Sequence, residues 1–255
     1  RLGPEANDIW ASTFHSACVR ILRRDIEKLG FSSSFTIYDT DDSLRVVKDC
    51  LKDLNIDEKQ FPPRSVLGYI SRAKDAMLLA DEYLAQCKAS GDFRLTKIAN
   101  IYMEYQRRLW EANALDFDDL HTVRLLQQHE DVRAFYQRKF RYVLIDEYQD
   151  TNNLQYLLAS TLAGGYENFC VVGDDDQSIY RFRGATIENI LSFEEQYKGC
   201  RVIRLEENYR STRHILEASN AVIRNNQGRK GKELWTDHGD GAKIRLHRSD
   251  SQEGE

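Results

Sequence analysis

Two adjacent carboxylates at the end of an apolar run are the residues with the clearest chemical potential. Asp146 and Glu147 directly follow residues 142–145 (YVLI), a run typical of a parallel strand buried on both faces. Adjacent carboxylates are costly there unless a cation or hydrogen bonds offset their repulsion. In phosphoryl transfer, one carboxylate can hold Mg²⁺ while the next deprotonates the attacking water. The alternative is a solvated pair that caps the next helix, and the apolar strand together with Gln149-Asp150 favours the chemical interpretation.

A second group of polar residues follows another apolar run and occupies residues 173–185 (GDDDQSIYRFRGA). Tyr180 and Phe182 could stack on nucleic-acid bases, an interaction worth about 1–3 kcal/mol per base. Arg181 and Arg183 could contact phosphates. An ordinary acidic turn with its aromatic residues in the core is the competing interpretation of this segment.

A third group precedes a helix for which Ser211 or Thr212 is the expected cap. Arg210 carries a permanently charged planar fork that suits the transition-state charge of a transferred phosphoryl group. Tyr209, beside it, could stack on a base. A surface arginine in a salt bridge is the alternative for Arg210 alone.

Hydroxyl and imidazole groups cluster at one expected helix start. Thr13, His15 and Ser16 could bind an anion such as a DNA phosphate at this N-terminus, and simple capping explains them equally well. Asp116 and Asp119 are interpreted as a capping arrangement.

Composition excludes some classes of protein. No apolar run approaches the roughly 18 residues that a membrane-spanning helix needs. Five widely spaced cysteines form no C-x-x-C pair, which fits a reducing cytoplasm better than export or a metal site. The net charge of −5 is only weak evidence against nucleic-acid binding, because a narrow groove needs only local positive charge.

The order of elements indicates an α/β fold. We expect a strand over residues 8–14 and a helix from His15 that ends before Gly30. Residues 38–114 read as a helical insertion. The strands and helices expected after it are strand 142–145, helix 154–163, strand 169–172, helix 186–197, strand 201–205, helix 211–225 and strand 243–246. Such alternation predicts a doubly wound parallel sheet, with ligands at the carboxyl ends of the strands.

Taken together, these motifs resemble the superfamily 1 DNA helicases of the UvrD/Rep/PcrA group across essentially the whole chain. The segments that carry the resemblance are residues 13–16 (TFHS), 115–120 (LDFDDL), 146–152 (DEYQDTN), 173–185 and 207–212 (ENYRST). The resemblance implies a partial RecA-like P-loop NTPase core, formed by residues 1–37 and 115–207 and interrupted by the helical insertion. Residues 208–255 would begin a second RecA-like core.

The resemblance also implies ATP and Mg²⁺ as cofactors and 3′ to 5′ movement on single-stranded DNA. Asp146 would bind Mg²⁺, Glu147 would be the catalytic base and Gln177 would contact the γ-phosphate. Arg210 would act from the second core, and Tyr209 would stack on adenine. Junctions of single- and double-stranded DNA would be substrates, and repair or replication proteins would be partners.

Further residues match family positions that contact DNA. Thr13, His15 and Ser16 match a motif near the DNA backbone, and Tyr180 and Phe182 match aromatic positions that hold bases. Phe182 stands where the family commonly has tryptophan, which reduces the stacking area and removes an N–H donor.

Two family features are missing from the 255 residues: no G-x-x-x-x-G-K-[ST] loop occurs, and the resemblance does not include the family's last motifs in the second core. We therefore expect a fragment of an ATP-dependent helicase that hydrolyses ATP negligibly by itself. Two alternatives remain open: a catalytically silent DNA-binding or interaction module, and a metal-dependent nuclease that uses Asp146, Glu147 and Asp150.

Overall fold

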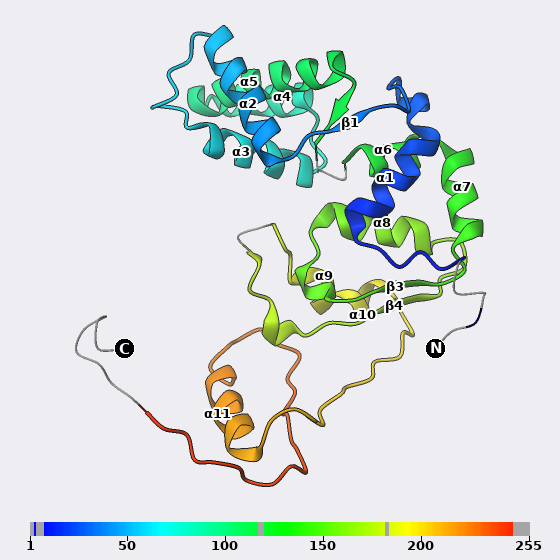
Figure 1. Ribbon diagram of the computed structural model, residues 1–255, viewed down its shortest axis with the longest axis vertical. Coiled ribbons are helices and arrows are strands. Elements are labelled where there is room, and N and C mark those ends of the chain that lie inside the picture. Colours follow the sequence, from blue (N-terminus) through cyan, green and yellow to red (C-terminus); the bar gives the residue numbers. More distant parts are fainter. Residues whose placement is uncertain (1–2, 4–7, 117–119, 182–183, 247–255) are drawn as a thin grey trace.

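The computed structural model describes residue 3 and residues 8–116, 120–181 and 184–246. These residues are mostly helical and contain two small parallel sheets (Figure 1). The principal helices are α1 (Phe14–Asp25), α2 (Thr40–Asp53), α3 (Pro63–Asp75), α4 (Ala80–Ser90), α5 (Phe93–Glu111), α6 (Leu120–Gln128), α7 (Glu130–Lys139), α8 (Asn153–Ala163), α9 (Glu188–Leu191), α10 (Phe193–Gln196) and α11 (Arg213–Ile223). Within this part of the chain, no helix is both long and apolar enough to cross a membrane.

Helix α1 forms where the apolar spacing predicts it. Thr13 caps the start of α1, and the buried face of the helix packs into a core shared with α6, α7 and α8. A 3₁₀ turn, η2 (Ile26–Leu29), extends it to Gly30, which adopts a left-handed conformation with φ of 86°. A side chain at Gly30 would also collide with the Trp110 ring. The expected helix and its end are therefore confirmed.

Helices α2 to α5 surround a second core of their own (Figure 1). Asp39 begins α2 with a reciprocal capping box, Pro63 occupies the first turn of α3, and Asp92 caps α5. All four helices lie within residues 38–114, where the sequence predicts helical structure. The division of the chain into domains stays a prediction.

The segments of the chain that precede and follow this helical region lie side by side in space. Strand β1 (Thr36–Ile37) precedes α2, strand β2 (Ala114–Leu115) follows α5, and the two strands pair in parallel. Asp116 comes directly after β2 and accepts hydrogen bonds from the Lys74 ammonium and from the Tyr105 hydroxyl, the latter at 2.9 Å. The capping interpretation of Asp116 is thus replaced by a buried ion pair, and Asp119 lies outside the described residues.

Strands β3 (Val143–Ile145) and β4 (Phe169–Val171) form the sheet that matters most for the site. They pair in parallel, and α8 lies between them in the chain. Both strands lie where the sequence predicts strands, but the expectation that they are fully buried is wrong. Leu144 is 69% exposed and Cys170 is also exposed, because a sheet of two strands has one face that no helix covers in the described structure.

Three other expected strands do not form, namely residues 8–14, 201–205 and 243–246. A strand needs a neighbour for its backbone hydrogen bonds, and the described residues give these segments none that forms a ladder. In the last two segments apolar side chains stay in solvent, as the 79% exposure of Leu205 and the 96% exposure of Leu246 indicate, whereas Trp10 of the first segment packs against the core that contains α1. The expected helix 186–197 is divided into α9 and α10 at Ser192.

Residues 201–246 carry α11, and this helix lies apart from the β3–β4 sheet in Figure 1. Helix α11 begins after Thr212, one of the two expected caps, although the Thr212 side chain makes no capping hydrogen bond. A single parallel bridge between Glu207 and Trp235 organises the extended segments beside this helix.

Candidate functional site

Asp146 and Glu147 lie at the carboxyl end of β3, as the sequence predicts. Oδ1 of Asp146 accepts a hydrogen bond from the Glu147 backbone N–H at 3.0 Å. Glu147 adopts a left-handed conformation with φ of 49° and ψ of 43°, which costs a non-glycine residue about 1–2 kcal/mol. Both side chains are exposed. A strained turn therefore presents two solvent-accessible carboxylates at the edge of the sheet.

The ladder between β3 and β4 continues past the ends of both strands. Val172 donates its backbone N–H to the Ile145 carbonyl at 2.8 Å, and Tyr148 donates to the Val172 carbonyl at 2.9 Å. The segments after the two strands are consequently held side by side. In an open α/β sheet, this carboxyl edge is where ligands bind.

Gln149 joins the two acidic motifs through its side chain, which is 1% exposed. Its Nε2 donates to Oε2 of Glu147 at 2.8 Å, and its Oε1 accepts the Asp174 backbone N–H at 2.9 Å. Gly173 makes room for this contact, since a Cβ there would lie 2.6 Å from Gln149 Oε1. The amide thus orients Glu147 and fixes the second motif to the first.

Asp150 and Thr151 complete the turn beneath these carboxylates. Burial, assisted by the nearby Glu147 charge, raises the pKa of Asp150. The Thr151 hydroxyl donates to the Tyr148 carbonyl at 2.7 Å, and Asn189 of α9 donates to the Thr151 carbonyl at 3.2 Å. Hydrogen bonds from a separate helix therefore hold the turn that carries Glu147.

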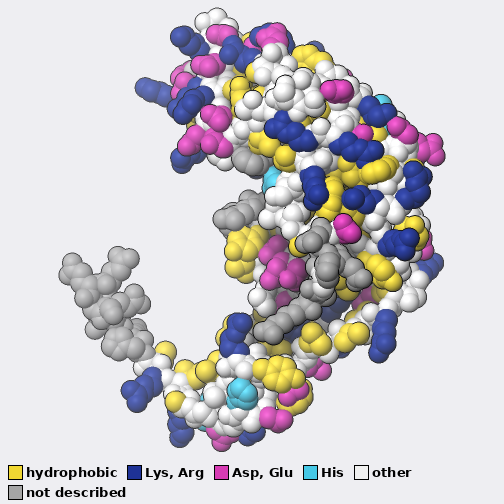
Figure 2. All heavy atoms as spheres, turned by 45° about the vertical axis from the view of Figure 1, so that its right-hand side comes forward, with side chains coloured by type: hydrophobic (Ala, Val, Ile, Leu, Met, Phe, Trp, Pro, Cys, Tyr) yellow, Lys and Arg dark blue, Asp and Glu magenta, His cyan; other side chains and the backbone are white. Residues whose placement is uncertain are grey.

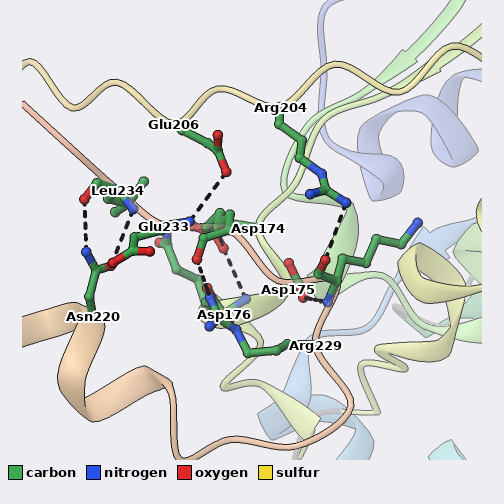
Figure 3. Close-up of polar contacts among 12 residues, drawn as sticks. Asp174, Asp175, Asp176, Arg204, Glu206, Asn220, Arg229, Glu233 and Leu234 are labelled. Atoms are coloured by element: carbon green, nitrogen blue, oxygen red, sulfur yellow. Dashed lines mark hydrogen bonds and ion pairs between the residues drawn. The ribbon is translucent and has the colours of Figure 1, made fainter.

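Gln177 follows β4 in a short 3₁₀ turn, η4 (Asp175–Gln177), and its side chain donates to Oδ2 of Asp174 at 2.6 Å. Asp174 also pairs with Lys232, a residue far along the chain (Figure 3). Burial opposes ionisation of Asp174, but hydrogen bonds from Lys232 and Gln177 outweigh it and lower its pKa. Asp174 is therefore an anion that orients the Gln177 amide.

Tyr209 and Arg210 lie on the segment before α11 and are both exposed. The Tyr209 hydroxyl donates to Oε2 of Glu207 at 2.6 Å, which raises the Tyr209 pKa. Within the described residues, no hydrogen bond or ion pair joins Arg210 to Asp146 or Glu147. The structure therefore brings the motifs after β3 and β4 together but leaves this pair apart from them.

The residues expected to contact DNA are only partly placed. Thr13 accepts the Ser16 backbone N–H at 3.3 Å and so caps α1, where His15 occupies the first turn. Tyr180 is 36% exposed. Phe182 and Arg183 lie outside the described residues. Capping of α1 by Thr13 is confirmed, and contact with DNA stays a prediction for all of them.

Sequence reasoning missed two features of this region. It did not assign Gln149 a bridging role, because only the fold shows that residue 149 meets residue 174. It also assigned no role to the basic residues 229–232 (RKGK), which contact the acidic residues 174–176 (Figure 3). The opposite charges of the two segments were the available signal.

The carboxylates at this edge suit a Mg²⁺ ion that is coordinated jointly by the protein and by a phosphate group. No cluster of three or more acidic, histidine or cysteine side chains that could enclose a metal occurs among the described residues. Mg²⁺ in nucleotide sites commonly uses one or two carboxylates, with phosphate oxygens and waters as the other ligands. Asp146, which is exposed at the strand end, fits that role. Figure 2 shows acidic side chains gathered in the hollowed side of the molecule.

Comparisons with known proteins agree over the full chain. Residues 1–198 match the UvrD/REP helicase N-terminal domain, and residues 203–255 match the UvrD-like helicase C-terminal domain. The ATP-dependent DNA helicase PcrA of Bacillus subtilis is 52% identical over 100% of this chain. PcrA proteins of Staphylococcus epidermidis and Staphylococcus aureus are 49% and 48% identical over the same extent. The chain spans only about a third of the length of these relatives, 34–35%.

Proposed function

Because the chain belongs to the UvrD/REP helicase family, we propose that it is part of an ATP-dependent DNA helicase that moves 3′ to 5′ on single-stranded DNA and unwinds duplexes. The observation that carries this proposal is the Gln149 bridge, which holds Glu147 and Asp174 together at the carboxyl edge of two parallel strands. That edge is where nucleotides bind in folds of this type. Bacterial relatives that match the full chain are named ATP-dependent DNA helicases.

The proposed nucleotide chemistry assigns a role to each described residue at this edge. Asp146 would hold Mg²⁺, which neutralises developing phosphate charge when it is bound. Glu147 accepts the proton of the attacking water, and Gln149 keeps its carboxylate oriented. Gln177 would contact the γ-phosphate, and Arg210 would reach the same phosphate from the second part of the chain. Tyr209, beside Arg210, stacks on adenine.

The proposed architecture is a partial RecA-like core with a helical subdomain inserted in it and the beginning of a second core. Residues 1–37 and 115–207 form the first core, residues 38–114 the subdomain, and residues 208–255 the second core. The pairing of β1 with β2 at the two ends of the subdomain supports this division.

Single-stranded DNA is the proposed polymer substrate. Thr13, His15 and Ser16 lie at the N-terminus of α1, where backbone N–H groups favour a phosphate. Tyr180 is partly exposed on the loop after η4 and would stack on a base. Phe182 and Arg183 are assigned to the same surface from the sequence alone.

The isolated 255-residue chain is expected to hydrolyse ATP negligibly, because it has carboxylates for Mg²⁺ and water but no glycine-rich loop for the phosphates. The test is the ATPase rate of the purified chain with Mg²⁺ and single-stranded DNA. Background hydrolysis is the expected result. A DNA-stimulated rate that disappears in Glu147→Gln would contradict the need for that loop.

A further inference from the structure

Two connections join the β3–β4 sheet to the part of the chain that carries α11. The covalent connection is residues 201–205, which are exposed and form neither helix nor strand. The second connection is made by side chains: residues 229–232 (RKGK), named here the basic clasp, contact residues 174–176 (DDD), named the acidic turn (Figure 3). The covalent connection alone cannot fix an orientation, so the basic clasp has to provide it.

Arg229 and Asp176 form the strongest contact of the clasp. Nε of Arg229 donates to one carboxylate oxygen of Asp176 at 2.8 Å, and Nη2 donates to the other at 2.5 Å. The two side chains are only 17% and 12% exposed. A two-pronged, partly desolvated pair of this kind is directional and exceeds an exposed ion pair in strength.

The other two carboxylates of the acidic turn are engaged as well. Lys232 pairs with Asp174. The Lys230 backbone N–H donates to Oδ2 of Asp175 at 2.7 Å, and the Lys230 ammonium pairs with Glu194 of α10. Each carboxylate of residues 174–176 thus accepts from a different residue of the basic clasp.

At the β3–β4 sheet, the basic clasp and the predicted site residue Gln177 both contact Asp174. Asp174 accepts from Lys232 through Oδ1 and from the Gln177 side chain through Oδ2. Its backbone N–H is held by Gln149, the amide that also binds Glu147. Displacement of Lys232 would therefore free one of the groups that set the orientation of Gln177.

On the side of α11, the clasp leads directly to the segment that carries Arg210. Trp235, just after the clasp, donates its N–H to the Glu206 carbonyl at 3.0 Å and accepts from the Asn208 N–H at 2.7 Å. The Asn208 side chain in turn accepts the Arg210 N–H at 3.0 Å. Gln177 is therefore linked to Arg210 by a hydrogen bond and an ion pair at one end of the series and by hydrogen bonds at the other, and the short backbone segment from Lys232 to Trp235 joins the two ends.

We propose that the basic clasp positions the Arg210 segment relative to Gln177, with Arg229 and Lys232 as positioning residues. This inference rests on the proposed function for the roles of Gln177 and Arg210. The physical claim is that contact between residues 229–232 and 174–176 orders both segments, and this claim requires no nucleotide.

Hydrogen exchange of the full 255-residue chain tests the clasp. In Arg229→Glu, backbone exchange should rise about tenfold in two peptides, residues 174–178 and 206–211. Exchange in α2 to α5 should stay unchanged, since those helices have a separate core. The charge swap Asp176→Arg with Arg229→Asp should restore most of the protection in both peptides.

The matched control is the pair of Arg224 with Glu233, whose side chains are 63% and 68% exposed. Arg224→Glu reverses the same charge beside the clasp and should leave both peptides unchanged. The proposal would be overturned if Arg229→Glu left hydrogen exchange in the two peptides unchanged, or if the charge swap did not restore their protection. Faster exchange in α2 to α5 would also overturn it, because Arg229 would then act on general stability. None of these results depends on ATP hydrolysis, so failure of the proposed function is a separate outcome.

Discussion

Asp174 donates its backbone N–H to the buried Oε1 of Gln149 at 2.9 Å, and this bond fixes the motif after β4 to the motif after β3. Gln149 uses its other side-chain atom, Nε2, to hold Glu147. The Gln149 amide therefore sets the position of the Glu147 carboxylate, the proposed base for the attacking water, relative to the turn that carries Gln177, the proposed phosphate contact. Support of this kind is what holds catalytic groups in a productive geometry.

Gly173→Ala is expected to destabilise the chain by about 1–3 kcal/mol. A Cβ at residue 173 would lie 2.6 Å from Gln149 Oε1 and 2.8 Å from Ile190 Cδ1. The measurement is urea unfolding followed by circular dichroism. The control is Gly68→Ala in α3, where the nearest atom lies at 3.9 Å and alanine should be neutral or stabilising by up to about 1 kcal/mol. Equal effects of the two substitutions would show that the space at Gly173 is not needed.

Lys74→Met is expected to cost about 3–5 kcal/mol of unfolding free energy, because it leaves the Asp116 carboxyl buried without its cation. The two side chains are 1% and 6% exposed. The double variant Lys74→Met with Asp116→Leu should recover most of that loss. Arg107→Met, which removes the ion pairs of a 51% exposed arginine with Glu104 and Glu111, should cost under about 1 kcal/mol. A double variant no more stable than Lys74→Met would contradict this account.

Because of His121, the free energy of unfolding should decrease as the pH is lowered from about 6.5 to about 4. Burial, followed by the positive charge of Lys74, lowers the pKa of His121 from 6.5 to about 4. In that window the unfolded chain binds a proton that the folded chain does not, so stability declines by up to about 1.4 kcal/mol per pH unit as the pH falls.

The measurement is the unfolding free energy of wild type and of His121→Phe at several pH values. Phenylalanine can keep the ring contact with Phe31, which has a centroid distance of 5.3 Å, but it cannot bind the proton. The difference between the two proteins should therefore change across the window and level off below it. Parallel pH curves would show that His121 does not contribute.

The sequence predicted the local elements well where a pattern was sufficient. The helical spacing and Gly30 located α1, and short apolar runs located β3 and β4. Residues 201–205 (RVIRL) were also expected to form a strand but do not, because a strand depends on a neighbour that its own sequence does not specify. The exposure of Leu144 was not predicted either, because the strand's own sequence does not show that no helix covers one face of its sheet in the described structure.

The candidate site was predictable as far as residues adjacent in the chain could define it. Asp146 and Glu147 were identified from their position at a strand end, and Gln177 was assigned from the family resemblance. The partner of Asp116 was not, because Lys74 lies 42 positions away and only the fold brings the two together. The contact of Arg229 with Asp176 spans 53 positions and was missed for the same reason.

The most direct test of the central claim uses a chimera of the Bacillus subtilis relative, in which this chain replaces the segment that it matches at 52% identity. We predict ATP hydrolysis stimulated by single-stranded DNA in the chimera. Glu147→Gln should lower kcat by at least about 100-fold while nucleotide binding is retained, since it removes the base but not the fold. A chimera that keeps its rate after Glu147→Gln would contradict the assignment of the catalytic carboxylate.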